Sequence, residues 1–143
     1  MSFFTGLQVS TSGLTSERFR VDLASSNLAN ANSTRSVEGG PYRRRDSVIR
    51  AIPVQGAFSS ELDRAVRTVQ VSNVRVDPRP PREVFNPSHP DADEKGIVRL
   101  PNVSTVEEMV NLRNAQRSYE ANLAALAVSR EMAQRALRIG RTS

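Results

Sequence analysis

The side chains that could perform chemistry are few in this chain of 143 residues. There is no cysteine and only one histidine, so one chain cannot supply a thiolate nucleophile, a histidine-based metal site or a catalytic triad. That histidine, His89, stands between Ser88 and Pro90, a setting typical of a loop. We therefore predict that the protein is not an enzyme and has neither catalytic residues nor a cofactor.

The stretch DADEKG resembles the opening of a calcium loop. Asp91, Asp93 and Gly96 have the spacing of an EF-hand, whose ligands are oxygen atoms. However, Lys95 stands where an oxygen ligand is needed, and Asn102 stands where the loop requires a bidentate glutamate. A solvated acidic turn is the simpler interpretation, and we predict no bound metal ion.

The densest basic cluster is the run Arg43, Arg44 and Arg45, in a chain of net charge +5. Such a run in a basic chain leaves open an alternative function, that of a basic helical nucleic-acid-binding protein. The neighbours Glu38 and Asp46 favour a salt-bridged protein interface instead. The sequence also lacks a glycine loop that could hold phosphate. We therefore expect neither nucleic acid nor a small-molecule substrate as a partner.

The elements that position these side chains begin with an N-terminal amphipathic helix. Leu7, Leu14, Val21 and Leu28 recur at intervals of seven and form a thin apolar seam. Two glycines and many serines and threonines lower the intrinsic helicity of this segment. We expect it to be weakly helical unless its apolar face is covered.

Three asparagines, Asn27, Asn30 and Asn32, follow at the end of this helix. Asparagine is unfavourable inside a helix because its short amide competes for backbone hydrogen bonds. Either the helix ends here or the amides bind something outside it. We expect both, with the helix fraying between Asn30 and Ser33.

A second amphipathic helix is predicted at the C-terminal end. Ser104 or Thr105 would cap it, Glu107 and Glu108 fall in its first turn, and Gly140 would end it after Ile139. Its seam, in alternating steps of three and four, consists of Met109, Leu112, Gln116, Tyr119, Leu123, Leu126, Arg130, Ala133 and Leu137. Polar residues within such a seam, here Gln116 and Arg130, usually determine register or partner choice.

The helical period is lost between Gly39 and Pro101. SVIRAIPV and AVRTVQVSNVRVDP alternate as strands do, QGAFSSELD could turn a hairpin between them, and a proline-rich connection follows. The predicted fold class is α+β, with long terminal helices paired as an antiparallel coiled-coil-like hairpin and a small central β element. We expect three segments: an N-terminal helix at 1–36, a β-rich and proline-rich region at 37–101, and a C-terminal helix at 102–143.

Two stretches resemble those of a known family. GLQVSTSGLTSERFRVDLASSNLANANSTRS, with its S-x-N-L-A-N core at Ser25 to Asn30, resembles the signature of flagellar rod and hook axial proteins. NPSHPDADEKGIVRLPNVSTVEEMVNLRNAQRSYEANL, from Asn86 to Leu123, is more discriminating and is similar to the short subunits of the proximal rod.

The resemblance implies a structural subunit that polymerises into the hollow drive shaft of the flagellum. The implied partners are further copies of the chain, other proximal and distal rod subunits, the MS-ring/rod junction protein and the flagellar export apparatus. The implied location is the basal-body rod in the periplasm. It would be reached by type III export without a cleaved signal, and the start MSFFTGLQVSTSGLTSERFR has no features of a Sec signal peptide.

The resemblance further implies that the terminal segments are disordered in the monomer and fold into helices on assembly. The apolar seams would then form the contacts between subunits. Polar amides would bond across subunits or line the channel, in particular those of Asn27, Asn30, Asn32, Asn111, Asn114 and Asn122, with Gln116 and Arg130 as further polar interface residues.

Overall fold

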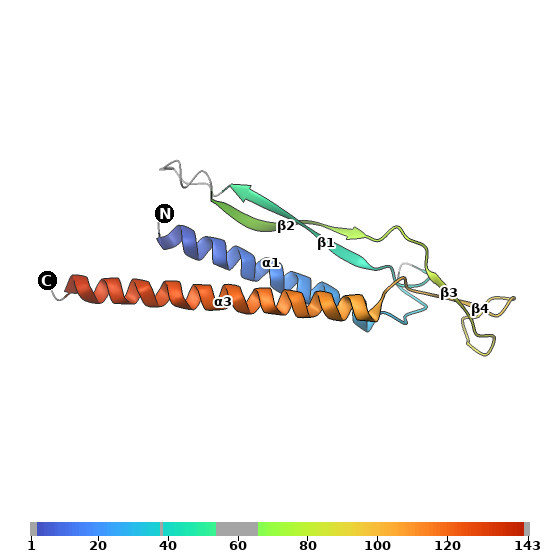
Figure 1. Ribbon diagram of the computed structural model, residues 1–143. Helices are drawn as coiled ribbons and strands as arrows, with labels where there is room; N and C mark the ends of the chain where they lie inside the picture. The colour runs from blue at the N-terminus through green and yellow to red at the C-terminus, as the bar shows by residue number, and fades with distance from the viewer. Residues whose placement is uncertain (1–2, 38, 54–65, 142–143) are drawn as a thin grey trace.

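The computed structural model describes residues 3–37, 39–53 and 66–141. The elements in chain order are helix α1 (Phe3–Ala29), strands β1 (Arg45–Pro53), β2 (Arg67–Val76), β3 (Arg82–Phe85) and β4 (Ile97–Leu100), and helix α3 (Thr105–Arg141). The predicted α+β fold with paired terminal helices is confirmed (Figure 1). Neither described helix is long and apolar enough to cross a membrane.

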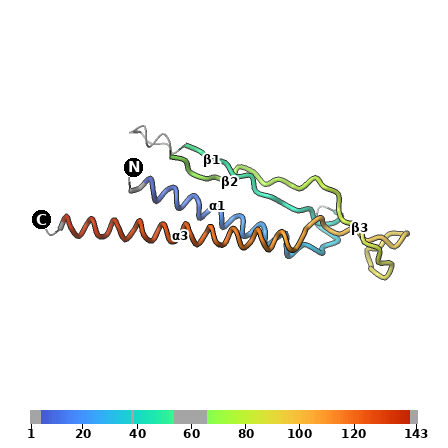
Figure 2. The backbone as a smooth tube through the Cα atoms, in the orientation of Figure 1, coloured from blue at the N-terminus to red at the C-terminus, as the bar shows by residue number. Residues whose placement is uncertain are grey.

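The two helices run antiparallel, so the described ends of the chain lie together at one end of the molecule (Figure 1). Gly13 of α1 lies against Asn122 of α3, and Asn27 lies against Glu108. These two contacts are fourteen residues apart along each helix, which is about 21 Å. The helices therefore keep one register over four turns. α3, with 37 residues against 27 in α1, extends beyond the N-terminal end of α1 (Figure 2).

The face of α3 that packs against α1 has a seven-residue repeat. It includes only about half of the residues of the predicted seam. One covered column is Leu112, Tyr119, Leu126 and Ala133, all half-buried. The other covered column is Glu108, Ala115, Asn122 and Ser129, buried or half-buried. The expected members of that second column, Met109, Gln116, Leu123 and Arg130, are exposed instead. The small and polar column is the one covered because it permits the close approach seen at Gly13, where an added Cβ would lie 2.9 Å from Asn122 Oδ1.

Two of the helix boundaries predicted from the sequence are confirmed, and one is wrong. Helix α1 ends at Ala29, and the Asn30 carbonyl accepts a turn hydrogen bond from the Ser33 amide, so the predicted end of the helix at the asparagines is confirmed. Ser104 caps α3, because its hydroxyl accepts from the Glu107 amide at 3.4 Å. The predicted stop at Gly140 is wrong. Gly140 is helical and α3 continues to Arg141, whereas a glycine cap would need the positive φ seen at Gly39.

Strands β1 and β2 form an antiparallel pair that lies along α1 on the side away from α3 (Figure 1). The register runs from Arg45 opposite Val76 to Pro53 opposite Arg67, with one bulge between Val48 and Ile49. The predicted turn QGAFSSELD lies outside the described residues. α1 is thus the middle layer of the molecule, between α3 and the β1–β2 sheet.

Two serines of α1 connect the helix to the β1–β2 sheet. The Ser12 hydroxyl accepts a hydrogen bond from the Val69 amide of β2 at 3.1 Å, and the Ser16 hydroxyl donates to the Val69 carbonyl at 3.4 Å. These hydroxyls thus form hydrogen bonds with the backbone amide and carbonyl of Val69 at the outer edge of β2. The residues that lower the helicity of α1 therefore attach the helix to the sheet.

A second hairpin forms where only an extended connection was expected. Strand β3 pairs with β4 antiparallel, from Arg82 opposite Leu100 to Phe85 opposite Ile97. The hairpin lies at the end of the molecule where α1 ends and α3 begins (Figure 1). The prolines of the connection stand outside the two strands, and Val98 in β4 is 2% exposed. The proline-rich region is therefore partly a folded element.

Candidate functional site

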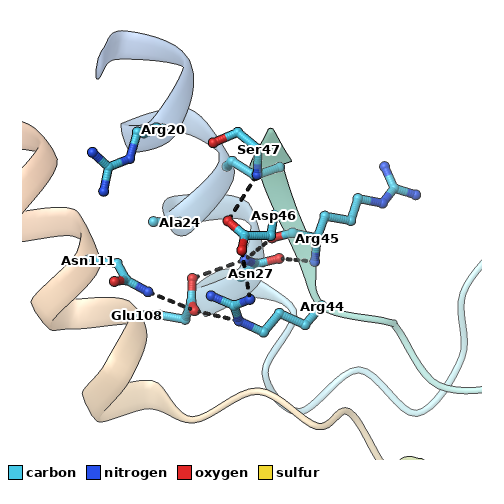
Figure 3. A pocket seen from close by; sticks show the side chains of 10 residues that line it. Arg20, Ala24, Asn27, Arg44, Arg45, Asp46, Ser47, Glu108 and Asn111 are labelled. Atoms are coloured by element: carbon cyan, nitrogen blue, oxygen red, sulfur yellow. Dashed lines mark hydrogen bonds and ion pairs between the residues drawn. The ribbon is translucent and has the colours of Figure 1, made fainter. Parts of the chain in front are cut away.

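A buried polar cluster joins the last turn of α1, the segment before β1 and the first turn of α3 (Figure 3). Its centre is Asn27, whose side chain is 1% exposed. Asn27 Nδ2 donates to the Arg45 carbonyl at 2.8 Å and to Glu108 Oε2 at 2.9 Å. Asn27 Oδ1 accepts from the Tyr42 hydroxyl at 2.8 Å and from the Arg45 amide at 3.0 Å. All four hydrogen-bonding positions of the amide are thus filled.

Glu108 is the charged member of this cluster and is also 1% exposed. Its Oε1 accepts from Arg44 Nε at 2.8 Å and from Asn111 Nδ2 at 3.3 Å. The Arg44 side chain is 15% exposed, and its distance to Asp46 is a longer 3.7 Å. The carboxylate is therefore both paired and hydrogen-bonded, as a buried charge must be.

We call Asn27, Tyr42, Arg44, Arg45 and Glu108 the Asn27 cluster. Such a set stabilises only one alignment of its three chain segments, because sliding α1 past α3 by one turn would leave buried amide and carboxylate groups unpaired. The cluster therefore acts by fixing the relative positions of these segments. Within the described ranges, no three His, Cys, Asp or Glu side chains are grouped so as to hold a metal ion.

The position of Asn27 differs from the sequence-based expectation, which placed its partners in neighbouring subunits. Its partners lie in the same chain. The salt bridge expected for the arginine run is present, but Arg44 makes it with Glu108 of this chain. The signals available in the sequence were the S-x-N-L-A-N motif and the two acidic residues in the first turn of α3. Sequence alone could not show that Glu108 faces inward, whereas Glu107 is exposed.

The other predicted polar residues are spread over the surface of the helix pair. Asn30 Nδ2 donates to the Ser26 carbonyl at 2.9 Å, and Asn122 Nδ2 donates to the Ser118 carbonyl at 2.9 Å, so both amides bond within their own helix or its end. The exposed members of the predicted set are Asn32, Asn114, Gln116 and Arg130. The structure does not bring these residues into one site.

The predicted apolar seam residues divide into two groups. Those that are half-buried are Leu7, Leu14, Val21, Leu28, Leu112, Tyr119 and Leu126. Those that are largely exposed are Met109 (54%), Leu123 (48%) and Leu137 (71%). One chain alone therefore leaves a substantial part of the apolar surface of α3 in solvent.

A second set of contacts joins the segment that follows α1 to the loop between β3 and β4. The Thr34 hydroxyl donates to Asp91 Oδ2 at 2.6 Å, and Arg35 forms an ion pair with Asp91. These partners lower the pKa of Asp91, the Thr34 hydrogen bond most strongly. Asp93 Oδ1 accepts from the Lys95 and Ile97 amides, both at 2.9 Å, which lowers the pKa of Asp93. The acidic loop thus uses its carboxylates to bind its own chain.

Comparison with known proteins matches each of the two helices to a profile of flagellar basal-body rod proteins. Residues 7–35 match a family profile described as "Flagella basal body rod protein". Residues 94–139 match one described as "Flagellar basal body rod FlgEFG protein C-terminal". Asn27 falls in the first matched stretch and Glu108 in the second.

The curated relatives match the chain over almost its whole length. The flagellar basal-body rod protein FlgC of Borreliella burgdorferi is 39% identical over 97% of this chain and 98% of its own. FlgC of Bacillus subtilis is 39% identical over 99% of this chain and 100% of its own. FlgC of Escherichia coli O157:H7 is 36% identical over 98% of this chain and 99% of its own. The chain therefore belongs to the FlgC family of flagellar basal-body rod proteins.

Proposed function

We propose that this structural subunit of the flagellar rod occupies its proximal part, where it polymerises with copies of itself and with other rod subunits. The observation that carries the proposal is the large apolar surface that one chain leaves uncovered on α3. Eight large apolar side chains of this helix are between 48% and 71% exposed, from Val106 to Ile139. Exposed apolar surface on this scale is typical of a protein–protein interface.

The contacts between subunits would be heterologous and would not close, because such contacts generate helical assemblies. The exposed seam residues Met109, Leu123 and Leu137, together with Gln116 and Arg130, are the proposed assembly interface. Asn122 and the half-buried seam residues of α3 belong instead to the face that packs against α1. Asn30 and Asn32 are proposed polar contacts beside it. The Asn27 cluster has a different role in this proposal: it holds the two helices and the β1–β2 sheet of one subunit in a fixed relation, so that torque passes through a stiff unit.

Two further partners follow from membership of the rod. We propose that the chain contacts the MS-ring/rod junction protein and that the flagellar type III apparatus exports it into the periplasmic space without cleaving a signal. The low helicity expected for α1 supports this route, because a narrow export channel requires a chain that unfolds readily. The basic run gives little support to a nucleic-acid-binding function, since Arg44 is engaged with Glu108.

A charge placed in the exposed seam tests the assembly proposal. Leu123→Asp should leave the monomer folded, because Leu123 is 48% exposed, yet it should prevent rod assembly and motility in a strain that lacks its own FlgC. Ser88→Asp, in the exposed β3–β4 loop, is the control and should restore motility. Normal basal bodies in the Leu123→Asp strain would contradict the proposal.

A further inference from the structure

The side of α3 that is turned away from α1 carries a second regular pattern, which the predicted seam does not include. We call it the outer stripe: Val106, Val110, Arg113, Arg117, Ala121, Ala124, Val128, Met132, Arg135 and Ile139. Every one of these residues is exposed, and Val106, Met132 and Ile139 are at least 61% exposed. Seven of the ten are apolar, and the described part of the chain leaves these side chains exposed to solvent.

The outer stripe repeats every eleven residues, in steps of four, three and four. One row of residues that are eleven apart is Val106, Arg117, Val128 and Ile139. A second such row is Val110, Ala121 and Met132. An eleven-residue period corresponds to about 3.67 residues per turn, and it keeps a stripe nearly parallel to the helix axis with a slight right-handed drift. The face of α3 that packs against α1 has instead a seven-residue period, which is typical of helices that wind around each other in a left-handed supercoil. One helix therefore presents two faces suited to two different partners.

The length of the outer stripe also restricts which kind of partner could cover it. From Val106 to Ile139 it extends about 50 Å along α3, at 1.5 Å per residue. A stripe that follows the axis over this length matches another long, straight helix, because a globular surface or an isolated strand would contact only part of it.

The charge of the stripe indicates which helix would fit. All three of its charged members, Arg113, Arg117 and Arg135, are arginines. Arg135 pairs within the helix with Glu131, which lies at the edge of the stripe. A second copy that met this stripe with its own outer stripe would place arginines opposite arginines, and Glu131, the carboxylate at the edge of that stripe, is already paired with Arg135. A different subunit with carboxylates beside an apolar row would satisfy both the charge and the apolar surface.

We propose that the outer stripe binds a long helix of a different rod subunit, one that presents small apolar residues with Asp or Glu opposite Arg113 and Arg117. This inference rests on the proposed packing of helices between rod subunits. It assigns the outer stripe to contacts between unlike subunits, and it leaves the predicted seam for the remaining contacts.

Photocrosslinking in assembled rods tests the site and the partner together. A photoreactive phenylalanine analogue at Val110 or Val128, in a FlgC-deficient strain, should give crosslinks in purified basal bodies. The expected product joins the stripe to a rod protein other than this chain. The crosslinked peptide, identified by mass spectrometry, should carry Asp or Glu within one helical turn of the attachment point. Gln116 and Leu123, from the seam, are the comparison positions.

The outcomes separate this inference from the proposed function. If assembled rods give crosslinks at Gln116 and Leu123 but none at the two stripe positions, the stripe inference is wrong and the rod function stands. Stripe crosslinks that join only two copies of this chain, or that reach peptides without carboxylates, would also overturn it. Absence of the chain from purified rods, with the unsubstituted chain as reference, would contradict the proposed function itself.

A charge series gives a second readout. Arg117→Glu should reduce incorporation into rods at least tenfold, because it places like charges opposite each other. Arg117→Ala should cost only about two- to fivefold, as expected for one partly exposed ion pair. Both variants should leave the circular dichroism of the monomer unchanged. Equal incorporation of the two variants would show that no carboxylate faces Arg117.

Discussion

Asn27 and Glu108 lie 81 residues apart in the sequence and are joined by a hydrogen bond of 2.9 Å between Nδ2 and Oε2. Each side chain is 1% exposed, and Glu108 also pairs with Arg44. This contact connects the two stretches that match flagellar rod profiles. In a rod subunit it makes the alignment of the terminal helices a property of the single chain.

The first prediction concerns the amide of Asn27. Asn27→Asp removes both donors and places a second carboxylate beside Glu108, so we expect the free energy of unfolding to fall by about 3 kcal/mol at pH 7. Part of this loss should be recovered at acidic pH, where protonation removes the repulsion. The matched control Asn30→Asp, at a half-buried site that bonds to nearby backbone and Ser33, should cost less than about 1 kcal/mol. Urea unfolding measures both, and equal losses would contradict the buried role of Asn27.

The second prediction measures the coupling between Arg44 and Glu108. A double-mutant cycle with Arg44→Gln and Glu108→Gln should give an interaction energy of about 1 to 3 kcal/mol, since the pair is direct and buried. A parallel cycle with the exposed neighbours, Arg43→Gln and Glu107→Gln, should give less than about 0.5 kcal/mol. A coupling near zero in the first cycle would show that the ion pair does not form in solution.

The terminal helices and the central strands could be predicted because each has a period or a boundary signal in the sequence. Apolar residues of α1 recur every seven residues, at Leu7, Leu14, Val21 and Leu28, and Ser104 with two glutamates shortly after it marks the start of α3. The β3–β4 hairpin was missed because prolines flank strands of only four residues each. Short strands carry too little alternation to be distinguished from an extended connection.

The Asn27 cluster could not be predicted because it depends on the rotation of α3 about its axis. The apolar pattern favoured Met109 and Leu123 as inward residues. The structure turns the helix toward the column of Glu108, Ala115 and Asn122, because Gly13 allows a close approach there. That choice arises from packing between segments more than eighty residues apart, which a pattern in one helix does not report.

The third prediction concerns the close contact at Gly13. An added Cβ would lie 2.9 Å from Asn122 Oδ1, so the Asn122 side chain would have to move and lose its hydrogen bond to the Ser118 carbonyl. We expect Gly13→Ala to destabilise the chain by about 1 kcal/mol despite the better helix propensity of alanine. The control Gly6→Ala meets nothing within 4 Å and should stabilise α1 by about 0.5 to 1 kcal/mol. Adding Asn122→Ala to Gly13→Ala should restore stability. Thermal unfolding tests all three, and an unaltered Gly13→Ala variant would contradict the register of the helices.

The fourth prediction concerns acid stability. Hydrogen bonds from Arg79 lower the pKa of Asp77 to about 2. A lowered carboxyl pKa means that the folded state binds the proton more weakly than the unfolded state does. The contribution of Asp77 is therefore complete at neutral pH and is lost as the pH falls from about 4 toward 2. In an NMR titration, Arg79→Gln should raise the Asp77 pKa toward 3.8, and the control Arg82→Gln should leave it near 2. Equal Asp77 titrations in the two variants would exclude the Arg79 side chain as the cause, since both variants keep the hydrogen bond from the backbone amide of residue 79.

The last prediction is that order in the free subunit decreases from the Asn27 cluster toward the other end of the helices. Near the cluster, Ala24 and Ala115 are 5% and 0% exposed, whereas Leu137 and Ile139 are 71% and 70% exposed. Amide exchange should therefore be at least about 100-fold slower in residues 108–118 than in residues 130–141 of the monomer, because local opening is easiest where little apolar surface is buried.

Incorporation into rods should slow exchange mainly in the fast segment, because neighbouring subunits would cover its exposed apolar residues. Asn27→Ala should remove much of the protection of residues 108–118 in the monomer, whereas Asn32→Ala, at an exposed position, should not. Uniformly slow exchange along the whole of α3 in the free chain would contradict folding on assembly. It would show that one subunit already holds both helices in their final form, and that the proposed export would have to unfold a stable hairpin.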